Sequence, residues 1–139
     1  MDTSAGPGGR RTSLFTDHYE LTMFQAALHS GAAHRRSVFQ AFARGLPAGR
    51  RYGIVAGTGR LLEGIADFRF ESDDLDFLAG TGVVHEDTLD HLAAFRFSGD
   101  IWGYPEGEAY FPHSPVLIVE STFAEACVLE TYVLSVLNH

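Results

Sequence analysis

Apolar side chains recur every three or four residues in several stretches of the chain, which is the spacing that predicts amphipathic α-helices. The first helix is expected to have Thr16 as its N-cap and to end at Ser30-Gly31. A short helix is expected to begin at Ser72, as its N-cap, and to end at Gly80. Further helices are predicted over residues 53–66, 85–95 and 121–139.

Short runs of β-branched and aromatic residues, interrupted by Pro and Gly, predict strands in the second half of the chain. These β segments are expected at Phe95 and Phe97 and over residues 100–104, 108–111 and 115–120, and an earlier strand is expected over 37–43. The fold class is therefore α/β (α+β), with helices beside a small, mainly antiparallel β unit. Residues 1–13 are rich in Gly, Ser, Thr, Pro and Arg and predict a disordered tail, so that one domain occupies residues 14–139.

The composition indicates a globular protein, because 45% of the 139 residues are hydrophobic and 20% are charged. A single cysteine, Cys127, excludes an internal disulfide and a cysteine-based zinc site. No apolar run reaches the length of a membrane span, and the first residues do not have the pattern of a signal peptide. We expect a soluble, cytoplasmic protein that binds no membrane.

The charges are distributed unevenly along the chain. All ten basic residues are arginines, and eight of them lie in residues 1–60 with three acidic residues, whereas residues 61–139 hold the remaining fifteen acidic residues. A basic first part in an acidic protein favours a local anion site over a nucleic-acid surface, which requires a basic domain. Chance scatter of a few arginines is the alternative.

Several possible motifs are incomplete. The pair Gly57 and Gly59 lacks the third glycine of a dinucleotide-binding loop, and His85 lacks a second histidine four residues later. The acidic residues 73, 74 and 76 are explained by helix capping. Glu106 and Glu108 share a face if they lie on a strand, but nothing else supports glycosidase chemistry. Cys127 lies in an apolar helix and is interpreted as inert core.

Two residues remain as candidates for ligand binding. Tyr19 stands near the start of a predicted helix, where its ring can stack on a flat ligand. The alternative is a core or interface tyrosine. Arg44 follows a predicted strand at the start of a glycine-containing loop, where a guanidinium can bind a phosphate through two hydrogen bonds. The alternative for Arg44 is a solvated surface arginine.

The same two residues lie in segments that resemble the nicotinate phosphoribosyltransferase family. The run from Leu14 to Met23, LFTDHYELTM, is similar to the opening signature of that family. Other segments resemble the family in the same order, at residues 38–47, 52–57, 95–112 and 114–120, followed by a helix with Glu125 and Leu129-Glu130-Thr131. The resemblance covers about residues 13–139.

The resemblance implies the N-terminal domain of a type II phosphoribosyltransferase, an α/β domain that precedes an irregular α/β barrel. Such enzymes form nicotinate mononucleotide from nicotinate and phosphoribosyl pyrophosphate, with ATP hydrolysis, in NAD salvage. By motif matching, Tyr19 reaches across a homodimer interface to stack on the nicotinate ring, and Arg44 contacts phosphate. Mg²⁺ and ATP are implied as cofactors with ligands outside this segment, so no metal ligand and no catalytic residue is assigned to it.

This chain departs from the family in length. No histidine lies in a segment like the one around the family's phosphorylated histidine, and the barrel is expected to come later than residue 139. The last predicted helix is apolar nearly all round and reaches Asn138-His139 without a capping glycine, which indicates an unfinished structure. We therefore expect an N-terminal portion that is inactive alone. The alternatives are a non-catalytic module that docks with a separate barrel-bearing chain, and a fragment of a nicotinamide-using relative.

Overall fold

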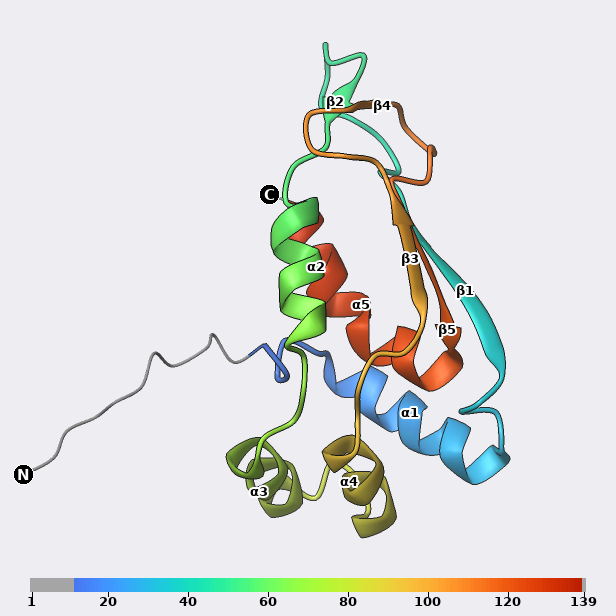
Figure 1. The fold of residues 1–139 in the computed structure, drawn as a ribbon, viewed down its shortest axis with the longest axis vertical. Helices are drawn as coiled ribbons and strands as arrows, with labels where there is room; N and C mark the ends of the chain where they lie inside the picture. Colours follow the sequence, from blue (N-terminus) through green and yellow to red (C-terminus); the bar gives the residue numbers. More distant parts are fainter. Residues whose placement is uncertain (1–11, 139) are drawn as a thin grey trace, which may run out of the picture.

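The computed structural model describes residues 12–138, which form five helices and five strands (Figure 1). The helices are α1 (His18–Ser30), α2 (Thr58–Ala66), α3 (Ser72–Thr81), α4 (Glu86–Ala93) and α5 (Phe123–Leu137). The strands are β1 (Arg36–Ala41), β2 (Gly53–Ile54), β3 (Asp100–Gly103), β4 (Ala109–Tyr110) and β5 (Leu117–Thr122). Among these described residues, no helix has both the length and the apolar character needed to cross a membrane.

Strand β5 is the centre of a three-stranded antiparallel sheet, with β1 on one side and β3 on the other. Phe39 of β1 and Ile101 of β3 both lie opposite Val119 of β5. Alternate side chains of β5 are buried, and Leu117 and Val119 belong to the hydrophobic core. Strands β2 and β4 form a separate antiparallel pair at the upper end of the molecule in Figure 1. The expected small antiparallel β unit is confirmed, and the first strand of the chain is part of it.

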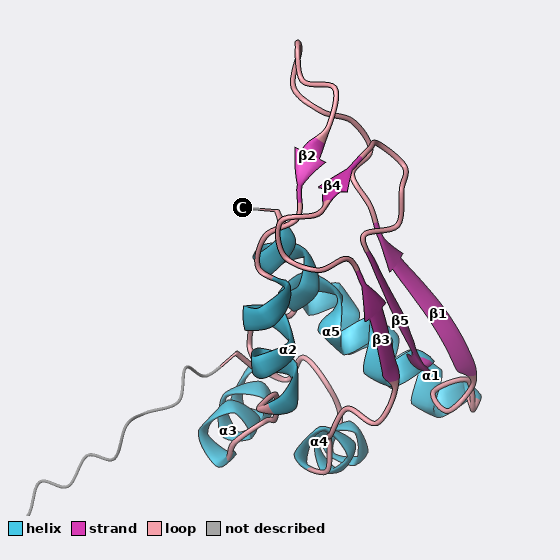
Figure 2. Cartoon of the chain, turned by 45° about the horizontal axis from the view of Figure 1, so that its top comes forward, coloured by secondary structure: helices cyan, strands magenta, loops and turns pink. Residues whose placement is uncertain are grey.

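Helix α5 is the centre of the helical layer. It packs against β1 and β5, while α1 and α2 pack against it, and α3 and α4 pair at the end opposite the β2–β4 pair (Figures 1 and 2). The buried residues of α5 point to nearly all sides of the helix: Ala124, Ala126, Cys127, Val128, Leu129, Tyr132, Val133 and Val136. The apolar helix expected over residues 121–139 is present, and elements of this chain cover most of it. Leu134 remains exposed.

A buried carboxylate joins the first turn of α1 to the middle of α5. Glu20 is fully buried, and its Oε1 accepts hydrogen bonds from the backbone N–H of Thr131 at 3.0 Å and from the Thr131 hydroxyl at 2.8 Å. Its Oε2 accepts from the Thr16 hydroxyl at 2.5 Å and from the Asp17 N–H at 2.9 Å. Every carboxylate lone-pair direction therefore has a donor, which is the condition for burying a charge. This arrangement fixes where the N-terminus of α1 lies relative to α5.

Two expected helix starts are displaced by one residue. Asp17, and not Thr16, is the N-cap of α1, because Glu20 at the third position completes a capping box with Asp17 and binds the Thr16 hydroxyl. Glu71, and not Ser72, caps α3 in the same way with Asp74. The capping role expected of the acidic residues 73, 74 and 76 thus holds for Asp74.

The helix expected over residues 53–66 is wrong in its first part. Gly53-Ile54 pair with β4, and the helix begins only at Thr58, because Gly57 has φ of 99°. Few residues other than glycine adopt this left-handed conformation. Similarly, α3 continues past Gly80 and ends where Gly82 has φ of 65°. The expected β segments at Phe95 and Phe97 lie outside the strands, and both side chains contribute to the core instead.

Most of the expected disordered tail, residues 1–11, lies outside the described residues. Its last two residues, 12 and 13, are among the described residues. Ser13 is buried, and its hydroxyl donates a hydrogen bond of 2.7 Å to Asp74 at the start of α3.

Candidate functional site

A groove of about 830 Å³ lies where the C-terminal half of α5 approaches the end of β1 and the β2–β4 pair. Its walls are mainly apolar, with Phe39 and Ala41 of β1, Ile54 of β2, and Val133 and Leu134 of α5 among them. Two charged side chains, Arg44 and Glu130, also line it. The groove therefore combines an apolar wall with a cation and an anion, which is the general composition of a small-molecule site.

Arg44 is placed at this groove by pairing that extends beyond the end of β1. The Val116 N–H donates to the Ala41 carbonyl at 2.9 Å, and the His113 N–H donates to the Ala43 carbonyl at 2.8 Å. Arg44 follows Ala43 directly, so these two hydrogen bonds fix the position of its backbone. The side chain is exposed and makes no ion pair or hydrogen bond within residues 12–138. Its five N–H donors are available to an anion, and a solvated surface arginine has the same geometry.

Tyr19 lies in the first turn of α1 and is joined to the groove through α5. Its hydroxyl donates a hydrogen bond of 3.4 Å to Oε1 of Glu130, which lines the groove, although Tyr19 itself does not. Tyr19 is 47% exposed within the described residues, so it is not part of the core that they form. Partial desolvation and the nearby charge of Glu130 raise the pKa of Tyr19 to about 12. The hydroxyl is therefore a neutral donor at physiological pH.

Glu130 is the residue of this site that the sequence analysis did not single out. Burial, followed by the charge of Glu20, raises the pKa of the Glu130 carboxyl, and the hydrogen bond from Tyr19 opposes that rise. Glu130 is one of few polar residues in an otherwise apolar helix, which is the sequence signal that points to it. Its pairing with Tyr19 spans 111 positions and is visible only in the folded chain.

The other candidates of the sequence analysis have structural roles. Glu106 and Glu108 both precede β4, so they do not share a strand face. The Glu106 carboxylate accepts hydrogen bonds of 3.0 Å from the N–H groups of Gly57 and Gly59. It therefore caps the N-terminus of α2. Cys127 is fully buried, and desolvation raises the pKa of its thiol to about 12, as expected for inert core.

Comparison with known proteins places the whole described fold in one family. Residues 14–138 match the family model described as the nicotinate phosphoribosyltransferase (NAPRTase) N-terminal domain. The chain is 57% identical over 126 residues to nicotinate phosphoribosyltransferase pncB1 of Mycobacterium tuberculosis, covering 91% of this chain and 28% of that protein. It is 32% identical to the nicotinate phosphoribosyltransferase of Bacillus subtilis over 127 residues, covering 91% of this chain and 26% of that protein.

A solved structure agrees with these sequence matches. The crystal structure of human nicotinic acid phosphoribosyltransferase superimposes with a TM-score of 0.79 and 29% identity, covering 88% of this chain and 25% of that chain. The expected fold class, helices with a small antiparallel sheet as in the N-terminal region of that family, is confirmed. The chain spans about a quarter of the length of the relatives that it matches.

Proposed function

The chain belongs to the nicotinate phosphoribosyltransferase family, and we propose that it is the N-terminal part of an enzyme that forms nicotinate mononucleotide from nicotinate and phosphoribosyl pyrophosphate, with ATP hydrolysis, in NAD salvage. The observation that carries the proposal is that one motif-matched residue lines the groove, while the other lies outside it and is hydrogen-bonded to a residue of its wall. Arg44 lines it, and Tyr19 is bonded to Glu130 in its wall.

In this proposal Arg44 binds a phosphate group of the substrate. The guanidinium has no partner within the described residues, and a planar fork of N–H donors matches a phosphate in two-point contact. The formal net charge of this chain is −8, so the chain as a whole repels a polyanionic substrate. The positive charge of Arg44 offsets this repulsion where the phosphate binds. Arg44 is therefore a binding residue that orients the substrate.

Tyr19 stacks its ring on the nicotinate ring in the same proposal. The hydrogen bond to Glu130 fixes the hydroxyl end, while nearly half of the side chain stays exposed and available to a flat ligand. The nicotinate that Tyr19 contacts lies at the interface between this chain and a second chain, which is either another copy of the enzyme or a complementing barrel chain. A ring held in place before binding loses little conformational entropy when the ligand arrives.

ATP and Mg²⁺ are proposed to act with residues outside these 139 residues. Mg²⁺ prefers a shell of oxygen ligands. The group of three close potential ligands found among residues 12–138 is His29, His85 and Asp87, and two imidazoles do not fit that preference. Mg²⁺ held by residues outside this segment would neutralise charge on the departing pyrophosphate.

The proposal predicts that the 139-residue chain makes no nicotinate mononucleotide alone but does so with a complementing chain. The test mixes it with the part of the Mycobacterium relative that it does not cover, and adds labelled nicotinate, phosphoribosyl pyrophosphate and Mg-ATP. Arg44→Gln is expected to raise the KM for phosphoribosyl pyrophosphate at least tenfold, whereas Arg51→Gln, in the same loop, leaves it unchanged. Robust product without the second chain, or no product from the mixture, contradicts the proposal. Use of nicotinamide in place of nicotinate would favour the nicotinamide-using alternative.

A further inference from the structure

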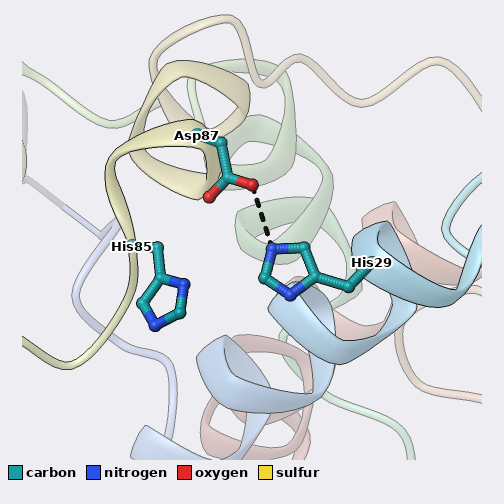
Figure 3. A group of neighbouring side chains, drawn as sticks. All are labelled: His29, His85 and Asp87. Atoms are coloured by element: carbon teal, nitrogen blue, oxygen red, sulfur yellow. Dashed lines mark hydrogen bonds and ion pairs between the residues drawn. The ribbon is translucent and has the colours of Figure 1, made fainter.

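Two histidines and an aspartate converge between α1 and α4, away from the residues that line the groove (Figure 3). His29 lies in the last turn of α1, His85 is the residue that precedes α4, and Asp87 lies in the first turn of α4. One ligand atom from each side chain lies within 4.8 Å of the others. His29 Nε2 and Asp87 Oδ2 are 2.9 Å apart, and the two imidazole rings have centroids 5.6 Å apart.

The backbone around this cluster is held in place before any ligand binds. The side-chain oxygen of Gln25, one turn before His29 on α1, accepts a hydrogen bond of 2.6 Å from the His85 N–H. The same oxygen accepts from the hydroxyl of Thr88, which is fully buried. Gln25 thus ties the start of α4 to α1, and it keeps the donors from the two helices together.

The side chain of Asp87 is also oriented. Its Oδ1 accepts the Thr88 N–H at 2.8 Å, which leaves Oδ2 directed to His29. The side chains of His29 and Asp87 are 45% and 58% exposed, so a solvated ion can reach them. Because Oδ2 of Asp87 is already oriented, only small rotations of the exposed histidine side chains are needed to bring all three ligand atoms to an ion.

The chemistry of the three groups selects a class of ion. Two imidazole nitrogens and one carboxylate oxygen form a common ligand set for Zn²⁺, which takes ligands at about 2.0–2.2 Å in a tetrahedron. In a tetrahedron with such bond lengths, neighbouring ligand atoms lie roughly 3.3 Å apart. The largest separation between the three ligand atoms, at most 4.8 Å here, must therefore shorten by about 1.5 Å when the ion binds. Hard cations such as Mg²⁺ and Ca²⁺ are disfavoured by the imidazoles.

We propose that His29, His85 and Asp87 form a Zn²⁺ site that joins the C-terminal turn of α1 to the N-terminal turn of α4, with water as the fourth ligand. The site is independent of the proposed enzymatic function, because none of its residues lies at the groove. The positive end of the α4 dipole opposes a cation, so the negative charge of Asp87 is required and not merely its oxygen. The consequence is that zinc stabilises the packing of α4 against α1.

The test titrates Zn²⁺ into the chelator-treated 139-residue chain by isothermal titration calorimetry. We expect one site, and a Kd raised at least tenfold by His29→Gln, His85→Ala or Asp87→Asn. His29→Gln keeps a side-chain donor for Asp87, and His85 makes no side-chain capping bond, so these variants preserve the fold. His34→Ala removes an exposed histidine in the turn after α1 and serves as the matched control.

A second readout follows the structural link. Saturating Zn²⁺ is expected to raise the Tm of the wild-type chain and of His34→Ala, but not that of His29→Gln, because only an ion that bridges the two helices stabilises the folded state. Bound Co²⁺ should give the intense visible absorption of a tetrahedral site in the wild-type and His34→Ala chains, but not in His29→Gln. Equal Zn²⁺ affinity in the wild-type and His29→Gln chains, or an equal loss in His34→Ala, would overturn the proposal.

Discussion

Replacement of Glu20 by alanine tests how the site is held, because this carboxylate joins the turn that carries Tyr19 to the helix that carries Glu130. Glu20 is fully buried and accepts four hydrogen bonds, two from Thr131 and two from the residues that precede α1. A hydrogen bond to a charged group contributes about 1.5–3 kcal/mol. The cost of burying the carboxylate, several kcal/mol, offsets part of the total.

We therefore expect Glu20→Ala to lower the free energy of unfolding by about 3 kcal/mol. Urea denaturation followed by circular dichroism measures this change, and Glu63→Ala, on the exposed face of α2, is the control with an expected change within about 0.5 kcal/mol. Thr131→Val removes one of the donors, and a double-mutant cycle with Glu20→Ala should give a coupling of about 1 kcal/mol. A loss below about 1 kcal/mol for Glu20→Ala, or additive effects in the cycle, refutes this account of how α1 is fixed to α5.

Three further predictions concern packing and ionisation. Gly64→Ala is expected to cost about 1–3 kcal/mol in urea denaturation, because the new Cβ would lie 1.7 Å from the Tyr132 hydroxyl, whereas Gly45→Ala meets nothing within 4 Å and should be neutral. The Cys127 thiol should react with a thiol reagent at pH 8 only after unfolding, since its pKa is raised to about 12; fast labelling of the folded chain would contradict its burial. Because the pKa of Tyr19 is 10 in the unfolded chain and about 12 in the folded one, its contribution to stability is complete below pH 10 and is lost between pH 10 and 12. Tyr19→Phe should therefore lose less stability than the wild-type chain over that interval, and equal slopes in pH-dependent urea denaturation would refute the assigned shift.

The sequence was a good guide wherever local spacing decides the structure. The apolar period over residues 16–30 predicts α1 to within two residues, and the almost wholly apolar run after residue 121 predicts the helix α5. That run does not predict that elements of this same chain cover most of α5. The start of α2 was misplaced because Gly53-Ile54 pair with β4, which lies more than 50 positions later. A short pairing of this kind leaves no local period, and two residues are too few for alternation to appear.

The parts of the candidate site that join distant segments were beyond sequence reasoning. Their places in motifs point to Tyr19 and Arg44, but the link between Tyr19 and the groove that Arg44 lines depends on Glu130, whose contact with Tyr19 spans 111 positions. No histidine follows His85 at helical spacing, and its neighbour in the folded chain is His29 on another helix. A pattern search along one element cannot detect ligands that tertiary packing brings together.

The KM for nicotinate in the complemented enzyme tests the central claim most directly. The 139-residue chain, as wild type or as Tyr19→Ala, is mixed with the remaining part of the Mycobacterium relative, and labelled nicotinate is varied at saturating phosphoribosyl pyrophosphate and Mg-ATP. If Tyr19 stacks on the nicotinate ring, Tyr19→Ala raises this KM at least tenfold, in line with about 1.4 kcal/mol of lost binding, while Phe77→Ala, an exposed aromatic residue on α3, has no effect. An unchanged KM in Tyr19→Ala would contradict the assignment of Tyr19 as the residue that stacks on nicotinate.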